Sequence, residues 1–392
     1  MGVGAKLSFR RGERRDSVTG RRWTQLTSGS GYTYPLYFFG PTVGRDQRTL
    51  VFYRFENGEV QNWKLDLEGE EAVQLTDART PNCLWRFWDE PEPAHGVREL
   101  MSALSPATDE LFYFDSNHLR AVHLHTLDDR LVYELPDDRV PCGLPGVSPD
   151  GRWMALTHID RVWWESTTAK GCPPRHEARK VHLDVIDLTA GISRPLVVMN
   201  SWLTHANFHD NQRILFCHPA SESAILMTDL RGGSYIHLRV QNSDGWEVSH
   251  YLSTARGILY ETVSPGDFGV IGMCDPDTYG CREFRTDYPI SHCGHDAAGK
   301  LWFGHAYRMQ PKVESFIAYL PTLHAEELNP FVPLTEGINC YGRSQRSHLH
   351  PVLMADRKNI LFTGPDDSTR TNHMYLLDVS DLSDVETAFP GH

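Results

Sequence analysis

Residues 345–351 carry three side chains that can bind one metal ion. The segment reads Gln-Arg-Ser-His-Leu-His-Pro, with His348 and His350 two positions apart. Side chains at i and i+2 of an extended chain share a face, so both imidazoles can point at one centre, and Gln345 is near enough to add an amide oxygen. Such an incomplete ligand set suits a catalytic metal. The alternative is a pair of exposed histidines, because H-x-H alone is a weak motif.

Other histidines recur at one position relative to a repeated β-rich run. Four successive runs each follow a histidine by eight to ten residues: His205 before Ile214, His250 before Ile258, His292 before Leu301 and His350 before Ile360. In a radial fold this position lies in or just before the innermost strand, so the four rings are expected to converge. The alternative is that polar residues at the mouth of a channel bind water.

Imidazoles with one amide suit Mn²⁺, Fe²⁺, Zn²⁺ or Ni²⁺ better than Ca²⁺, which prefers several carboxylates. We take His292, Gln345, His348 and His350 as the ligands, which leaves positions for a substrate. His250 and His205 are then expected beside the metal. An imidazole that binds no metal titrates near neutrality and can remove a proton from a bound substrate.

The β-rich runs define the fold. Their starts are separated by 61, 42, 61, 44, 43 and 59 residues, a period near 43 with insertions in three units. Turns such as Ser148-Pro149-Asp150-Gly151 precede the runs, and a second apolar strand follows each one. Four short antiparallel strands per period are typical of a propeller blade, and helical periodicity is nearly absent. The sequence predicts an all-β, seven-bladed β-propeller. The seven runs begin at Leu50, Leu111, Trp153, Ile214, Ile258, Leu301 and Ile360.

The domain limits follow from how such a propeller closes. The Gln-Leu-Thr string at residues 25–27 repeats the one at residues 74–76, so residues 23–27 are expected to complete the last blade. Residues 1–22 are interpreted as an N-terminal extension and residues 23–392 as one catalytic propeller domain. The insertions, at about residues 77–100, 159–180 and 306–345, are expected to wall a pocket.

Charge and composition exclude several classes of partner. The net charge of −13 argues against nucleic acid and anionic membranes. No apolar run reaches the length of a membrane helix, and the basic residues 1–22 do not resemble a secretion signal. The eight cysteines form no C-x-x-C pair, so reduced thiols in a cytoplasmic protein are expected. A monomer and a homodimer are both compatible with the sequence.

These motifs together resemble the oligogalacturonate lyases, seven-bladed propeller enzymes of pectin breakdown. The resemblance is carried by Q-x-x-H-x-H-P at 345–351, Ser291-His292, Ser249-His250, Trp202-Leu203-x-His205 and Phe216-Cys217-His218. It implies that Gln345, His348, His350 and His292 hold Mn²⁺ and that His250 is the base of a β-elimination. The substrate would be a small acidic oligosaccharide, whose carboxylate the metal binds while His250 removes the C5 proton.

The chain departs from the family pattern in the pocket. Two cationic positions of the family are replaced, one by Tyr34-Pro35 and one in the segment after His218, which has no arginine before Arg231. Groups that could contact substrate are therefore His205, His218, Tyr34, Arg86 and Arg308. Two alternatives stay open: lyase, epimerase or hydratase chemistry on another uronide or a keto-sugar, and a non-catalytic binding propeller of the TolB-like kind.

Overall fold

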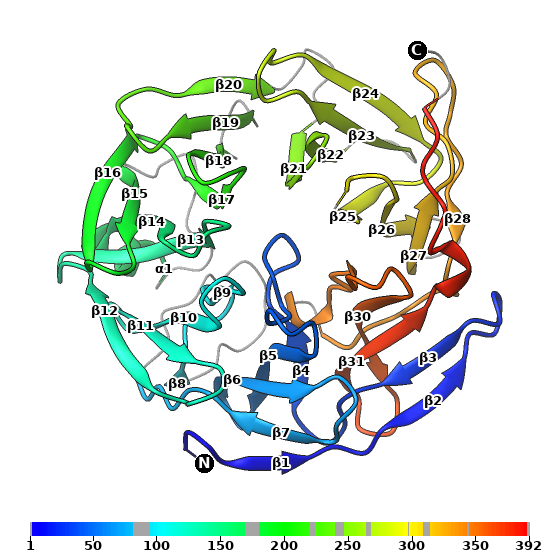
Figure 1. The fold of residues 1–392 in the computed structure, drawn as a ribbon, viewed down its shortest axis with the longest axis horizontal. Helices are drawn as coiled ribbons and strands as arrows, with labels where there is room; N and C mark the ends of the chain where they lie inside the picture. The colour runs from blue at the N-terminus through cyan, green and yellow to red at the C-terminus, as the bar shows by residue number, and fades with distance from the viewer. Residues whose placement is uncertain are drawn as a thin grey trace. The chain divides into compact units, whose positions relative to one another are not determined.

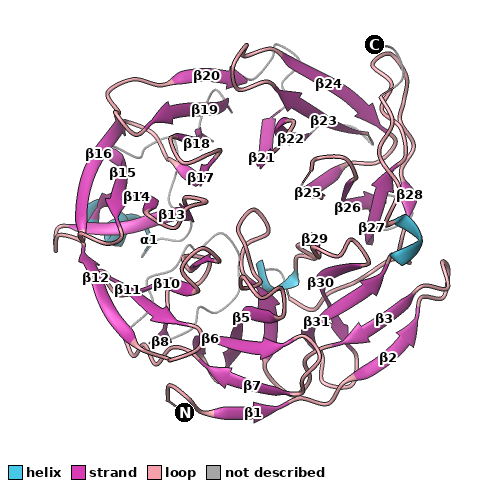
Figure 2. Cartoon of the chain, in the orientation of Figure 1, coloured by secondary structure: helices cyan, strands magenta, loops and turns pink. Residues whose placement is uncertain are grey.

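The computed structural model describes residues 2–80, 95–168, 180–218, 224–239, 247–263, 268–296, 298–308, 314–342 and 345–389. Strands dominate these residues (Figure 2). They include one α-helix, α1 (Arg161–Thr168), and two 3₁₀ turns, η2 (Gln345–Ser347) and η3 (Ser380–Leu382). The all-β class is confirmed.

The strands in the described part of the chain assemble into seven sheets (Figure 1), and these sheets belong to two compact units. Unit 1 comprises Met1–Phe9, Ser30–His237 and Gly342–Gln345. Unit 2 comprises Arg10–Gly29, Leu238–Tyr341 and Arg346–His392. Each unit is described by itself.

Unit 1 carries four of the sheets formed by described residues. The first has the order β1 (Lys6–Ser8), β7 (Glu71–Gln74), β6 (Glu59–Asp66), β5 (Thr49–Glu56), β4 (Tyr32–Pro35), and the short β8 (His95–Gly96) pairs in parallel with β6. The second has the order β12 (Asp129–Glu134), β11 (His118–His123), β10 (Glu110–Asp115), β9 (Ala103–Ser105). The third runs β13 (Arg139–Val147), β14 (Trp153–Asp160), β15 (Val181–Asp187), β16 (Ile192–Met199). The fourth runs β17 (Thr204–Phe208), β18 (Arg213–His218), β19 (Ala224–Asp229), β20 (Ile236–Arg239).

Unit 2 carries the other three sheets of the described residues. One runs β21 (Glu247–Thr254), β22 (Gly257–Val263), β23 (Gly269–Cys274), β24 (Cys281–Thr286). The next runs β25 (Ile290–His295), β26 (Trp302–Arg308), β27 (Glu314–Leu320), β28 (Val332–Pro333). The last has the order β2 (Gly12–Arg15), β3 (Arg22–Gln25), β31 (Thr371–Asp378), β30 (Asn359–Asp366), β29 (Val352–Leu353).

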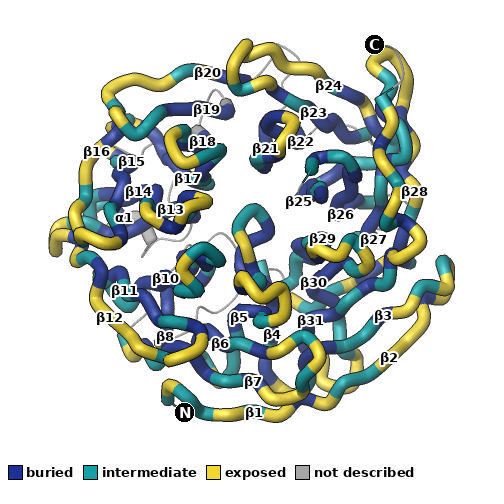
Figure 3. Tube along the Cα trace, viewed as in Figure 1, coloured by how far each residue is buried: buried dark blue, intermediate teal, exposed yellow. Residues whose placement is uncertain are grey.

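Each of the seven predicted runs lies at the strand next to an end strand of its sheet. These strands are β5, β10, β14, β18, β22, β26 and β30. The middle of β14, for example, is buried from Met154 to Ile159, whereas half or more of the positions in the edge strands β12, β16 and β24 are exposed (Figure 3). A strand that is covered on both faces reads as a continuous apolar run, and so the runs could be located from sequence.

Strand β3, near the N-terminus, joins the last sheet, as the sequence predicts, and β2 adds one more strand at its outer edge. β3 pairs with β31 in antiparallel register, with Trp23 opposite Leu377. Trp23 is 1% exposed and packs edge-on against Phe362, with ring centroids 4.9 Å apart. The guanidinium of Arg14 on the neighbouring β2 lies 3.9 Å from the Trp23 ring centroid, a cation–π contact. The two ends of the chain are therefore joined by a sheet and by an aromatic cluster.

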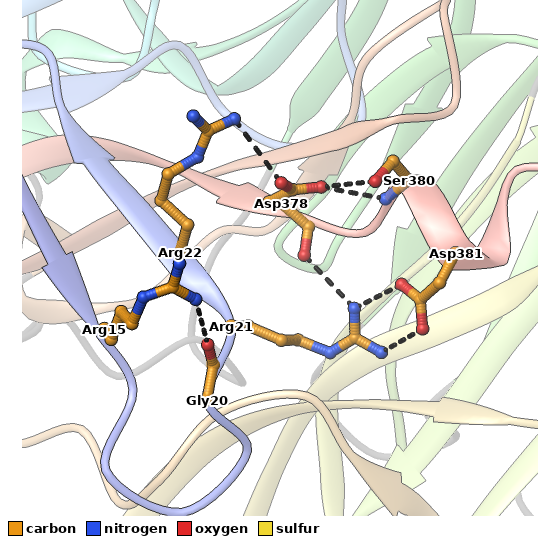
Figure 4. Close-up of a pocket in the computed structure, with 7 residues that line it drawn as sticks. All are labelled: Arg15, Gly20, Arg21, Arg22, Asp378, Ser380 and Asp381. Carbon is orange, nitrogen blue, oxygen red and sulfur yellow. Dashed lines mark hydrogen bonds and ion pairs between the residues drawn. The ribbon is translucent and has the colours of Figure 1, made fainter.

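The segment interpreted as an N-terminal extension contains two strands. Within residues 1–22, β1 pairs with β7 and β2 pairs with β3. Figure 4 shows Arg15, Arg21 and Arg22 beside the chain that follows β31. Arg21 donates to Asp381 at 2.7 Å and Arg22 donates to Asp378 at 3.4 Å. The two aspartates neutralise much of the positive charge of this pocket. Their contacts with the arginines help to hold the N-terminal strands against the end of β31.

The cysteines depart from the expectation of reduced thiols. Cys274 and Cys281 form a disulfide between β23 and β24. They are register partners in the antiparallel pair, with Cα atoms 4.1 Å apart, so the hairpin itself brings the sulfur atoms together. The spacing of seven residues matches no short cysteine motif, and the pairing becomes visible only once the strand register is known.

The helices among the described residues are not long and apolar enough to cross a bilayer.

We predict that Trp23→Ala lowers the free energy of unfolding by about 3–5 kcal/mol, because it opens a cavity in the aromatic cluster between β3 and β31. Urea unfolding followed by fluorescence and circular dichroism measures the change. Val18→Ala, at a side chain that is 74% exposed, serves as the control and should stay within about 0.5 kcal/mol of the wild type. An equal effect of both substitutions would contradict the closing role of β3.

Candidate metal centre

Bulges in the first strand of successive sheets position the predicted histidines. The strand register shifts between Thr204 and Asn207 in β17, between Val248 and His250 in β21, and between Ser291 and Gly294 in β25. A bulge bends the strand and re-aims a side chain. His205, His292 and His350 also have positive φ angles of 54°, 54° and 41°. Left-handed backbone is uncommon for a residue with a Cβ atom and is concentrated at functional sites.

Three of the four predicted metal ligands lie together in unit 2. His292, His348 and His350 each offer a ring nitrogen, and these three atoms are within 4.8 Å of one another. The His348 Nδ1 to His292 Nε2 distance is 3.5 Å. The ring centroids of His292 and His350 are 4.5 Å apart. The cluster combines an HxH segment ahead of β29 with a residue of β25, as the sequence predicts.

Burial keeps these imidazoles neutral. His292 and His350 have no exposed surface, and desolvation, followed by repulsion from neighbouring imidazoles, holds the pKa of both well below the ordinary value. The pKa of His348 is lowered to about 4, again chiefly by burial. A neutral imidazole has the lone pair that a metal ion needs. These three neutral imidazoles, two buried and one half-buried, therefore fit a divalent transition metal.

A further histidine, His305, belongs to the same cluster. It is 2% exposed, its ring stacks on His292 at 5.6 Å, and its Nδ1 lies 3.3 Å from His292 Nδ1. Contacts at Nδ1 leave His292 Nε2 to face His348, and contacts of this kind orient a ligand ring. Sequence reasoning missed His305 because it is on β26, opposite Ser291, and so does not share the offset of the other histidines.

The predicted base, His250, lies against the cluster. Its ring centroid is 4.5 Å from that of His292, and 12% of its side chain is exposed. His250 Nδ1 is 2.5 Å from Glu261 Oε1. Glu261 is fully buried on β22, directly opposite His250. Burial alone would raise the pKa of Glu261, but His250 and the hydrogen bonds to Cys293 lower it below the usual value.

Gln345, the fourth predicted ligand, begins the turn η2. Its Oε1 is buried and has no hydrogen-bond partner among the described residues, as expected of an atom that can accept an ion. Gln345 falls in unit 1 and the histidines fall in unit 2. Its place in the ligand set stays a prediction.

Two predicted substrate contacts lie in unit 1. His205 Nε2 is 3.2 Å from the Tyr37 hydroxyl, and His205 Nδ1 is 3.6 Å from Cys217 Sγ. Tyr34 is fully buried, and its hydroxyl donates to the carboxylate of Glu99. Side chains engaged in this way help to shape the interior of unit 1, and their contact with a substrate stays a prediction.

The remaining predicted contacts are less well defined. Arg308 ends β26, where its side chain is 46% exposed and pairs with Glu314 at 3.5 Å. Arg86 lies outside the described residues, and His218 is described only as the last residue of β18. Their roles toward a substrate stay predictions.

A second group of possible ligands, His158, His182 and Asp184, is in unit 1. Arg139 Nε donates to His158 Nδ1 at 2.9 Å, so the proton of a neutral His158 is on Nε2, which lies 3.2 Å from Asp184 Oδ2. A protonated nitrogen cannot bind a metal, and the guanidinium repels a cation. This group is therefore better described as a polar cluster in which His158 lies between Arg139 and Asp184.

Comparisons of sequence connect the chain to known enzymes. The family model described as oligogalacturonate lyase matches residues 1–306, more than three quarters of the chain. The oligogalacturonate lyase of Dickeya dadantii (strain 3937) is 26% identical over 97% of this chain and 99% of its own length. The oligogalacturonide lyase of Pectobacterium atrosepticum is 24% identical over 97% and 99%, respectively.

Comparisons of structure agree on the fold. An oligogalacturonate lyase in complex with manganese has a TM-score of 0.79 at 22% identity and covers 98% of this chain and 100% of its own. An oligogalacturonate lyase from Vibrio parahaemolyticus also has a TM-score of 0.79, at 19% identity, and covers 96% and 98%. The fold is a seven-bladed β-propeller, as the seven repeats predict. With a family model that matches most of its length, the chain is a lyase of the oligogalacturonate lyase family.

Proposed function

We propose that this protein cleaves short oligogalacturonides by β-elimination, with His250 as the base and a divalent transition metal beside it. One observation carries the proposal: the ring centroid of His250 lies 4.5 Å from that of His292, which forms a cluster with His348 and His350. A site for a cation and a candidate base are thus adjacent. A cytoplasmic location, a monomeric or dimeric state and an acidic oligosaccharide as the binding partner belong to the same proposal.

His292, His348 and His350 would hold the metal, with Gln345 as the fourth ligand. Mn²⁺ is the first choice because a related oligogalacturonate lyase has been solved with manganese, and Zn²⁺, Fe²⁺ and Ni²⁺ accept the same donors. A bound cation supplies positive charge where the substrate carboxylate gains negative charge during elimination.

His250 would remove the proton from C5 of the uronate. The electron pair of the C5–H bond forms the C4=C5 double bond, and the oxygen on C4 leaves with the rest of the sugar chain and takes up a proton from water. Glu261 next to His250 Nδ1 balances the charge that the ring gains on accepting the proton. The products are an unsaturated uronate and a shortened oligosaccharide.

A second substrate class is favoured by one observation. At Tyr34, one of the positions where a cation of the family is replaced, the side chain is buried and donates to Glu99. This position therefore supplies no positive charge to a second uronate carboxylate. Lyase, epimerase or hydratase chemistry on a different uronide or keto-sugar at the same site is the alternative function.

Steady-state assays separate the two functions. The unsaturated product of elimination absorbs in the ultraviolet, so its absorbance is followed with digalacturonate, trigalacturonate and other uronides. Growth of absorbance with galacturonides supports the first function. A metal-loaded protein that leaves galacturonides unchanged contradicts it and favours the second.

We predict that His350→Ala loses metal and activity together, because it removes one of three clustered imidazoles. Loss of a group that only contacts a ligand weakens metal binding roughly 10–100-fold. Loss of a ligand itself should weaken metal binding at least as much. Metal content after dialysis, measured by mass spectrometry, and the rate with trigalacturonate check this. His237→Ala, at an exposed histidine, is the control. Full metal content in His350→Ala would remove His350 from the ligand set.

A different outcome is expected for His250→Gln, which should retain metal and lose about 10²–10⁴-fold in kcat, the usual contribution of a general base. Glutamine keeps polar contacts but cannot accept the proton. The same two measurements are made on the variant, with His237→Ala as the control. A kcat close to that of the wild type would show that another group is the base.

A further inference from the structure

Glu261 is a buried carboxylate whose role goes beyond charge balance. Three donors converge on its two oxygens. His250 Nδ1 lies 2.5 Å from Oε1, the backbone N–H of His292 donates to Oε1 at 2.6 Å, and the backbone N–H of Cys293 donates to Oε2 at 2.6 Å. An ionised carboxylate only accepts hydrogen bonds. Each of these contacts therefore requires hydrogen on the partner atom.

That requirement determines which nitrogen of His250 carries the proton. Because Nδ1 donates to Glu261, the lone pair of the neutral ring is on Nε2. Ser249 Oγ, 2.9 Å from the same Nδ1, is compatible with this arrangement because a hydroxyl oxygen also accepts. The Nε2 form is the one that can take a proton from a substrate.

The same carboxylate connects the candidate base to the metal cluster. Glu261 is on β22, opposite His250 on β21, and it accepts from two backbone groups in the bulge of β25. These bonds hold the left-handed backbone at His292, where φ is 54°. Glu261 thereby fixes both rings, whose centroids are 4.5 Å apart.

We propose that Glu261 is a positioning residue that holds His250 in the tautomer with its lone pair on Nε2. This inference rests on the proposed function of His250 as base. Such a residue contacts neither substrate nor metal, and its removal is expected to slow the proton transfer while the substrate still binds.

The variant Glu261→Gln tests the inference because it keeps the size of the side chain. An amide has one acceptor oxygen and one N–H₂ group, so it cannot satisfy all three donors. Turning the N–H₂ group toward Nδ1 stabilises the opposite tautomer of His250. We expect kcat to fall about 10–100-fold, in the range seen when groups that orient a reacting side chain are removed, with little change in KM and in metal content.

Glu283→Gln is the matched control. Glu283 is on β24 of the same sheet and accepts from Tyr260 and Arg239. The variant makes the same chemical change at a carboxylate whose hydrogen bonds go to Tyr260 and Arg239. It should leave kcat and the His250 tautomer unchanged.

Nitrogen NMR of the full chain labelled with ¹⁵N-histidine measures the tautomer directly, in the metal-free protein and with diamagnetic Zn²⁺ added. The His250 signals are identified by their loss in His250→Gln. We expect a proton on Nδ1 in the wild type and a shift toward Nε2 in Glu261→Gln.

A wild-type His250 protonated on Nε2 overturns the inference, even if Glu261→Gln fails to fold. So does a Glu261→Gln variant with wild-type kcat, or one that loses its metal together with its turnover, since Glu261 would then act on the backbone of His292. If the wild type cleaves no uronide, the proposed function fails and the tautomer measurement still decides the role of Glu261.

Discussion

A buried negative charge needs compensation, and at Glu261 that constraint links two neighbouring sheets. Transfer of an unpaired carboxylate to a dry interior is unfavourable by several kcal/mol, so the charge is stable only where donors surround it. Here the donors come from β21 and from the bulge of β25. The unusual backbone at His292 and the orientation of His250 both follow from the need to satisfy one side chain.

The imidazole cluster adds a second unfavourable feature that points to function. His292, His305 and His350 are all buried within one group, and their neighbours, like the loss of solvent, disfavour the charged form. A hydrophobic core would fill the same space with fewer polar atoms that need hydrogen-bond partners. Local features that reduce stability without an evident structural gain are typical of binding and catalytic sites.

The sequence predicts the blades because strands buried on both faces read as regular apolar runs. It also predicts which histidines share a position, since the offset from each run places His250 and His292 in the first strands of their sheets. Glu261 was missed because it ends an apolar run, and its partner is defined only by the pairing of β21 with β22. The same limit applies to the disulfide at Cys274 and to His305, whose partners follow from strand register.

Loops and insertions were beyond sequence reasoning for another reason. The contact of Tyr37 with His205 depends on the path of the chain between β4 and β5, which no periodic pattern specifies. A shared offset placed His205 correctly in a first strand but could not reveal that a loop from another sheet would reach its ring. Positions that depend on irregular chain segments need coordinates.

The pairing of β3 with β31 has a consequence for biosynthesis. Trp23 leaves the ribosome 354 residues before its partner Leu377. Synthesis at about 5–20 residues per second leaves the edge of β3 without its partner for many seconds, and during that time a nascent chain could bind another chain or a chaperone. His350 lies just ahead of β29, which belongs to the sheet that β3 joins, so the histidine cluster is also complete only long after β3 has been made.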